Sequence, residues 1–294
     1  MKPIAIDKLA FNVIAYAVIA VVSLLCVVPF IMVVAGSFTA ESAVMAHGYG
    51  LWPSSFSVES YRAILTDPTS LIKAYGVTLF ITVTGTAAGL FLTAMTAYVL
   101  YRKEFRYRNL FAFFFYFTTL FNGGLVAYYL IMLKYYHMKD SLLALIVPLL
   151  LSPYYILIMR NFLKTVPDAI PESAKVDGAG EFTIFTRLCL PLMKPALASI
   201  GMFIALGYWN DWYQAALFID DQSKFPLQYM LYKMITNIEF LSYAAGNNGI
   251  PTVELPHETV KLAMTVVSIG PIVLIYPFVQ KYFVKGLTVG AVKG

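Results

Sequence analysis

Charged residues are scarce in this chain: Asp, Glu, Lys and Arg make up 13% of its 294 residues, whereas hydrophobic residues make up 60%. Soluble domains carry about 25% charged residues, and the mean hydropathy here is +0.73. The composition therefore argues against a soluble protein and indicates an integral membrane protein. The net charge of +5 gives no support for a nucleic-acid partner, because basic residues beside membrane spans set topology instead.

Cysteine and histidine are rare as well. Cys26 lies in an apolar run and Cys189 in a polar stretch, so we expect no disulfide and interpret both as small apolar residues. His47, His137 and His257 are isolated and lack metal-ligand spacing, so we expect no metal site.

The sequence motifs of catalysis are also missing. The chain contains no His-Glu-x-x-His, no Gly-x-Ser-x-Gly, and no glycine directly before a lysine, which excludes a Walker-type phosphate loop. We expect no catalytic residues and no bound cofactor. Energy for any work must come from a partner protein, from an ion gradient or from the substrate gradient.

Long apolar runs are what the chain has instead. A run of about 18 or more uncharged residues is a candidate membrane helix, because backbone polar groups in lipid need internal partners. Six such runs predict an all-α membrane protein with a single domain over residues 1–294: 9–36, 74–100, 109–133, 141–159, 195–219 and 262–280. The first is too long for a secretory signal, and the fifth is interrupted only by Asp211.

The basic residues predict which side of the membrane each loop faces. With both termini on one side, that side holds fourteen of the 21 Lys and Arg residues and the other side holds seven. The positive-inside rule then places both termini in the cytoplasm, most firmly through the cluster at 102–108. It also places 160–194 in the cytoplasm and the longer loops 37–73 and 220–261 outside, the second as an ordered cap.

The stretch 172–191 is polar and lies between two predicted spans, so it must project into water. Prolines and carboxylates at its start predict a helix of about two turns over 171–177. Gly178 is expected to end that helix with a positive φ.

A second short helix is predicted after Gly180, at an angle to the first. It places Phe182, Phe185, Leu188 and Cys189 on one face and is stopped by Pro191. On spacing alone, an ordinary cytoplasmic loop with a surface helix explains the pattern equally well.

The residues of this stretch resemble a known motif. The pattern consists of Glu172, Ala174, Asp177, Gly178, Ala179, Phe185, Leu190, Pro191 and Pro195. It is similar to the cytoplasmic motif of permease subunits of binding-protein-dependent ABC importers, and nearly the whole chain resembles sugar-importer permeases of the maltose-permease type. FNGGLVAYYLIM at 121–132 and KGLTVGAVKG at 285–294 are similar to permeases for complex oligosaccharides. Ser173 departs from the family, which usually has alanine there.

The resemblance implies a type I ABC importer fold in which the loop 160–194 carries a coupling helix docked into a cytoplasmic ATPase subunit. The residues expected to couple the two are Glu172, Ser173, Ala174, Asp177, Gly178, Ala179, Gly180 and Pro191. The implied partners are a second homologous permease, two ATPase subunits that use ATP and Mg, and an extracytoplasmic solute-binding protein, in the lipid of a bacterial plasma membrane. By resemblance the tail 285–294 reaches toward the ATPase dimer interface, although composition alone fits a terminus held near anionic lipid.

Polar and aromatic residues in the spans suggest a path for a sugar substrate. An ionisable residue inside a span is costly and functional by default, which singles out Asp211. On one helix Gly207, Asp211 and Gln214 would share a face beside aromatic rings. The candidate path residues are Asn122, Tyr128, Tyr154, Trp209, Asn210, Asp211, Trp212 and Tyr213. The alternative for the two tryptophans is an interfacial belt.

Two prolines, Pro148 and Pro153, are expected to bend the fourth span and free backbone carbonyls there. Gly123 and Gly124 fit a kink or close helix packing as well as a substrate lining.

Two further function classes remain. An autonomous secondary transporter or channel is disfavoured by the lack of a visible inverted repeat and by the few ionisable residues in the spans. A membrane-embedded enzyme lacks a catalytic constellation. Uptake by this chain without an ATPase would favour the autonomous transporter.

Overall fold

The computed structural model describes residues 4–248 and 258–274, most of which are helical. The chain divides into two units: Met1–Pro68 with Leu231–Pro271, and Thr69–Met230 with Ile272–Gly294. The tail at 285–294 lies outside the described residues.

The first unit begins with α1 (Ile4–Ser37), a helix long and apolar enough over Lys8–Ser37 to cross a membrane. The first predicted span is thereby confirmed as a helix of membrane length. Two short helices follow in the predicted outer loop, α2 (Glu41–His47) and α3 (Glu59–Ile64).

A further helix is described over residues 258–274, of which 258–271 belong to this unit. The Glu41 carboxylate accepts hydrogen bonds from the Glu258 and Thr259 N–H groups, both at 2.9 Å. It thereby caps donors that the first turn of a helix leaves without a partner. The loop after α1 is thus fastened to the start of this helix.

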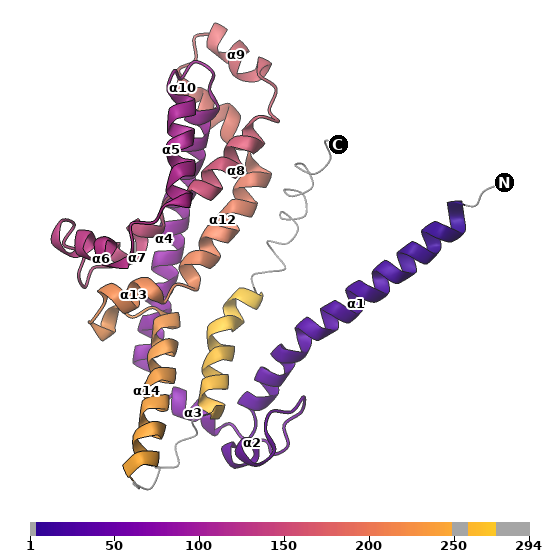
Figure 1. Ribbon diagram of the computed structural model, residues 1–294, viewed down its shortest axis with the longest axis vertical. Helices are drawn as coiled ribbons and strands as arrows, with labels where there is room; N and C mark the ends of the chain where they lie inside the picture. Colours follow the sequence, from indigo (N-terminus) through magenta and orange to yellow (C-terminus); the bar gives the residue numbers. More distant parts are fainter. Residues whose placement is uncertain (1–3, 249–257, 275–294) are drawn as a thin grey trace. The chain divides into compact units, whose positions relative to one another are not determined.

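The second unit is organised around α4 (Pro68–Tyr101), an unbroken helix of 34 residues that is about 51 Å long at 1.5 Å per residue. Its other main helices are α5 (Arg108–Leu120), α6 (Leu125–Lys134), α7 (Leu143–Ile146), α8 (Pro153–Leu163), α12 (Lys194–Trp209) and α13 (Tyr213–Phe218). Helices α4, α5, α8 and α12 run side by side, with α9 (Ala169–Val176) and α10 (Glu181–Thr183) at one end and α6 and α13 toward the other (Figure 1).

The predicted span 109–133 is broken into α5 and α6, which are bent by 115°. The Asn122 side-chain oxygen accepts the Gly124 N–H at 2.8 Å, and Gly124 has a φ of +83°. Glycine adopts this conformation without steric cost. The predicted span is therefore not one continuous helix, and the glycine pair lies at its kink, one of the alternatives that the sequence left open.

The predicted span 141–159 is broken as its prolines indicated. Leu143–Leu149 and Pro153–Leu163 are bent by 46°, with Pro148 in the 3-10 turn η1 (Val147–Leu149) and Pro153 as the first residue of α8. The Ile146 carbonyl, just before this break, accepts the Tyr208 hydroxyl at 2.8 Å. A backbone carbonyl beside the break is therefore occupied by a tyrosine hydroxyl.

The predicted span 195–219 is shorter than expected. Helix α12 ends at Trp209 and α13 begins at Tyr213. The Asn210 amide donates to the Leu206 carbonyl at 3.0 Å, the kind of local side-chain hydrogen bond that competes with a continuing helix. The predicted helical face of Gly207, Asp211 and Gln214 is therefore wrong.

By length and composition, two of the described helices can cross a membrane, or up to five if each bent pair is one span. The sixth predicted span, 262–280, is helical as far as residue 274, and its remainder lies outside the described residues. In the outer loop predicted at 220–261, η3 (Gln222–Lys224) precedes α14 (Leu227–Asn248). The expected ordered cap is thus helical over most of its described length.

The core of the second unit joins α4 to α12 at Tyr208, whose side chain is 1% exposed. A Cβ on Gly85 would lie 2.4–2.6 Å from three atoms of that ring. Glycine is therefore needed at position 85 for the two helices to approach this closely.

Candidate functional site

Helix α9 lies in the loop between α8 and α12, residues 164–193, which we name the α9 loop. It covers Ala169–Val176 and starts two residues before the predicted 171–177, with Pro171 in its first turn, where a proline is tolerated. Gly178 has the expected positive φ, +81°. The Gly178 N–H donates to Lys175 O and the Ala179 N–H to Ala174 O, the two bonds of a Schellman cap.

The predicted coupling residues other than Pro191 lie in this short helix or within four residues of its end. Glu172 and Ser173 are exposed, Asp177 is the C-cap residue, and Gly180 precedes α10. Ala174 and Ala179 pack against the buried core of the unit, whereas Pro191 lies in α11 (Leu190–Leu192). The helix thus has one anchored face and one open face.

The α9 loop is anchored by a π-helical segment, η2 (Ile184–Cys189), where Ile184, Phe185 and Cys189 are buried. The Phe185 ring packs 5.3 Å from the ring of Tyr98 in α4. Phe182 is exposed, although its ring centroid lies 6.4 Å from that of Phe185. A π turn inserts an extra residue and shifts the helical register, and such turns are frequent at functional sites.

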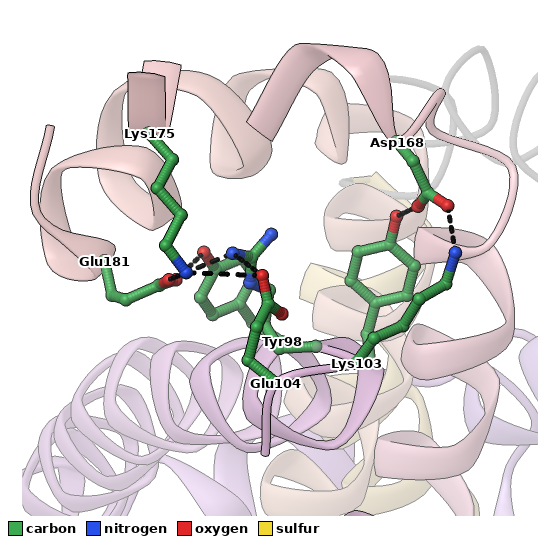
Figure 2. Close-up of polar contacts among 8 residues, drawn as sticks. Tyr98, Lys103, Glu104, Asp168, Lys175 and Glu181 are labelled. Carbon is green, nitrogen blue, oxygen red and sulfur yellow. Dashed lines mark hydrogen bonds and ion pairs between the residues drawn. The ribbon is translucent and has the colours of Figure 1, made fainter. Parts of the chain in front are cut away.

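Two sets of polar contacts fasten the α9 loop to the end of α4 (Figure 2). The first, which we name the N-terminal tie, holds Asp168 directly before α9. Its carboxylate accepts the Tyr101 hydroxyl at 2.6 Å and the Lys103 ammonium at 2.5 Å.

The second set, the C-terminal tie, holds Glu181 beyond the Schellman cap. The Tyr98 hydroxyl donates to Glu181 Oε2 at 2.7 Å, and the Arg102 guanidinium donates to Glu181 Oε1 at 2.9 Å. Arg102 also bonds Glu104 at 2.8 Å, and Lys175 lies 3.3 Å from Glu104 Oε1 and 3.4 Å from Glu181 Oε1. The Arg102 side chain is 9% exposed, so its charge is buried between two carboxylates.

The ties shift the pKa values of their members. Hydrogen bonds from Lys103 and Tyr101 hold the pKa of Asp168 below its ordinary value. Burial raises the pKa of Glu181, but the Tyr98 hydrogen bond and the Arg102 charge outweigh it, so the pKa is lowered on balance. The hydrogen bond to Asp168 raises the pKa of Lys103. All these groups are therefore charged at neutral pH.

Sequence reasoning missed most of these residues as a site. The cluster at 102–108 was used only for topology, and Asp168 only as a helix-start signal. The available signal was the spacing of Tyr98, Tyr101 and Arg102, which lie three or four residues apart at the end of a long apolar run and so share one helical face. Their partners, sixty or more positions away, could not be identified without the fold.

The ties enclose a cavity of about 290 Å³ between the end of α4 and α9. Arg102, Glu104, Pro171 and Glu172 are among its lining residues. The underside of α9 is therefore polar and charged, unlike the apolar packing of η2.

The candidate substrate-path residues fall into separate places. The Tyr128 hydroxyl donates to Gln214 at 2.6 Å, which joins α6 to α13 near Asp211. Trp209 is buried beside a cavity of about 390 Å³ that α4 and α12 line, and Trp212 packs edge-on to Tyr213. The structure thus brings Tyr128 close to the 209–213 segment.

The remaining path candidates have local roles. Asn122 makes the turn between α5 and α6, and Asn210 caps the end of α12. Tyr154 is exposed at the start of α8 and packs on its neighbour Tyr155. Asp211 differs, because its Oδ2 atom is buried and has no hydrogen-bond partner within the described residues.

A metal centre has no support in the part of the chain that the structure describes. There, no three His, Cys, Asp or Glu residues come together in a way that would hold an ion. The site is therefore a set of hydrogen bonds and ion pairs around a short helix.

Comparison with known proteins matches residues 85–289 to the family described as binding-protein-dependent transport system inner membrane component. Protein LplC of Bacillus subtilis is 37% identical over 93% of this chain and 91% of that protein. The polygalacturonan/rhamnogalacturonan transport system permease protein YtcP of Bacillus subtilis is 36% identical over 97% of this chain and 98% of that protein.

A solved structure is similar over nearly the whole chain. It is a crystal structure of a bacterial ABC transporter involved in the import of the acidic polysaccharide alginate. The TM-score is 0.80 at 28% identity, covering 96% of this chain and 100% of that one. The chain therefore belongs to the family of inner membrane components of binding-protein-dependent transport systems, the permeases of ABC importers.

Proposed function

We propose that this permease carries oligosaccharides across the membrane and that α9 is the coupling helix through which an ATPase drives it. The observation that carries the proposal is the construction of α9. It is a short helix with a Schellman cap, the residues on its two flanks are tied to the end of α4 and the turn after it, and Glu172 and Ser173 of the helix are exposed. A helix held rigidly in this way can transmit the movement of a partner protein that docks on its exposed residues.

The substrate class rests on the relatives. Besides YtcP, the arabinooligosaccharides transport system permease protein AraQ of Bacillus subtilis is 27% identical over 92% of this chain and 92% of that protein. Saccharide chains are named for these proteins and for the alginate importer. We infer a saccharide of more than one unit as the substrate of this chain.

We infer the same partners for this chain that the resemblance implies. They are a second permease, two cytoplasmic ATPase subunits that bind ATP and Mg, and an extracytoplasmic binding protein that delivers the sugar. Six spans with both termini in the cytoplasm would place α9 against the ATPase, and the positive-inside count supports that orientation. The chain itself binds no cofactor in this proposal.

The substrate path is proposed to pass the segment of Trp209, Asn210, Asp211, Trp212 and Tyr213, with Tyr128 beside it. Carboxylate and amide groups bind sugar hydroxyls, and aromatic rings stack on apolar sugar faces. The buried Asp211 Oδ2, which has no hydrogen-bond partner among the described residues, supports this place, because burying such an atom without a partner is costly.

The proposal is tested in proteoliposomes that contain the assembled complex with its binding protein. Mass spectrometry of the ligand that co-purifies with the binding protein identifies the sugar, which is then used radiolabelled. We expect uptake only with ATP, Mg and both ATPase subunits. Uptake by this chain alone would contradict the proposal and favour a secondary transporter or channel.

A further inference from the structure

Within the described residues, polar side-chain contacts on both flanks of α9 reach the end of α4 and the turn that follows it. The N-terminal tie uses Tyr101 and Lys103, and the C-terminal tie uses Tyr98 and Arg102. Two attachments, one on each side of a rigid helix, fix its direction as well as its position. A single attachment would leave α9 free to pivot.

Helix α4 is also a continuous helix that leads from the α9 loop through this unit. It runs unbroken from Pro68 to Tyr101, whereas the segments containing α8 and α12 are bent by 46° and 84°. A bent pair absorbs displacement at its break, but a continuous hydrogen-bonded helix moves as a rod.

The far half of α4 contacts the parts that a moving rod would displace. Thr78 Oγ1 accepts the Leu227 N–H at 2.8 Å, at the first residue of α14. Gly85 lies against Tyr208, whose hydroxyl binds Ile146 before the proline break. Movement of α4 therefore reaches α12, α14 and the break between α7 and α8.

From these contacts we propose that Tyr98, Arg102 and Glu181 are positioning residues that make α9 and α4 one moving body, so that α4 carries the motion of α9 to the outer half of the unit. The inference rests on α9 being the coupling helix. Apolar packing of Phe185 and Ile184 holds the loop in place without fixing its angle, because apolar contacts are not directional. Hydrogen bonds and ion pairs at Glu181 fix that angle.

This division of roles predicts a specific defect. Loss of the C-terminal tie leaves the loop attached and the ATPase docked, so ATP is still hydrolysed. Helix α9 then pivots, and its motion is no longer transmitted to α4. The quantity that falls is the amount of sugar imported per ATP hydrolysed, which a purely structural contact would not change.

The test uses the full complex in proteoliposomes, with Arg102→Glu, Glu181→Arg and the double variant that carries both changes. We expect each single variant to lower the import-to-ATP ratio about five- to tenfold, the lower end of usual coupling between sites, and the double variant to recover most of it. Arg106→Glu is the matched control, because Arg106 is exposed in the same basic cluster and outside both ties. An unchanged ratio in both single variants overturns the inference.

Tyr98→Phe keeps the test decisive if a charge-reversed variant does not assemble, because it removes one hydroxyl and keeps the ring. We expect a lowered import-to-ATP ratio with unchanged assembly, and an unchanged ratio overturns the inference. A second readout is the distance between spin labels at Val176 and Leu79, both exposed, after Cys26 and Cys189 are replaced by serine.

The distance distribution should stay the same with and without ATP in the complex with intact ties, and broaden in Tyr98→Phe. A distance that changes with ATP while the ties are intact also overturns the inference. Failure of the proposed function looks different, since the complex without these changes would then show no ATP-driven uptake.

Discussion

At the residue scale, two substitutions of Gly178 distinguish backbone strain within this chain from a steric clash with a docked ATPase. Its φ is +81°, and a Cβ added there meets no atom within 4 Å. Gly178→Ala should therefore cost only the strain of the left-handed conformation, about 1–2 kcal/mol. Gly178→Trp adds bulk that this chain accommodates but a docked ATPase does not.

We expect Gly178→Trp to insert at a normal level and to abolish sugar uptake, whereas Gly178→Ala retains most of it. Membrane-fraction immunoblotting measures the level, and radiolabelled sugar measures uptake. Normal uptake in the tryptophan variant would show that the open side of α9 is not a docking surface.

Tyr208 and Gly85 test close packing between α4 and α12. Tyr208→Phe loses the bond to the Ile146 carbonyl and should destabilise the protein by about 1 kcal/mol. Gly85→Ala should cost more, about 1–3 kcal/mol, because its methyl group meets a fully buried ring. Thermal unfolding of the purified complex in detergent measures the stability of both variants. Equal losses, or a larger loss in Tyr208→Phe, would contradict this account of the packing between α4 and α12.

At the scale of elements, the two ties determine how α9 responds to pH. The pKa values of Asp168, Glu104 and Glu181 are lowered in the folded chain. A lowered carboxyl pKa contributes stability that is present above the unfolded-state pKa of about 4 and disappears as the pH falls through the lower folded value. The raised pKa of Lys103 keeps its charge through neutral and mildly alkaline pH.

We therefore expect the attachment of α9 to be independent of pH between about 5 and 9 and to weaken below about 4. Hydrogen exchange of the α9 amides, corrected for the intrinsic pH dependence of exchange, measures this directly. A loosening of α9 between pH 6 and 8 would indicate that other groups hold it.

The α9 loop also shows what the sequence could and could not predict about elements. The helix and its glycine end were predictable, because capping signals are local and Gly178 had a conformational reason to be there. The π turn in the second helix was not predicted, because it depends on packing of Phe185 against α4 rather than on propensity. The ties could not be found at all, since they join residues such as Arg102 and Glu181 across 79 positions.

The breaks within the predicted spans were missed for a related reason. Hydropathy averages over a window, so 109–133 and 195–219 looked continuous. The actual breaks depend on single side chains, the Asn122 turn and the Asn210 cap, whose hydrogen bonds compete with the helix. Pro148 and Pro153 were the exception, because a proline break is fixed covalently and can be read from sequence.

At the scale of the whole molecule, orientation in the membrane decides whether the proposed mechanism is physically possible. An ATPase in the cytoplasm can grip α9 only if the α9 loop is on that side. Fourteen of the 21 basic residues fall on the side assigned to the cytoplasm, including the cluster that ties α9. Two of the residues from which this orientation is predicted, Arg102 and Lys103, also tie the α9 loop.

Single cysteines at Val176 and Trp52 test this orientation, because these are the most exposed large hydrophobic residues in the α9 loop and in the loop after α1, at 88% and 85%. In a chain whose Cys26 and Cys189 are replaced by serine, a membrane-impermeant maleimide should label Trp52→Cys in intact cells and Val176→Cys only in inverted vesicles. Labelling of Val176→Cys in intact cells would place α9 outside the cell. No cytoplasmic ATPase could then reach it, and the coupling mechanism would be excluded whatever the sugar.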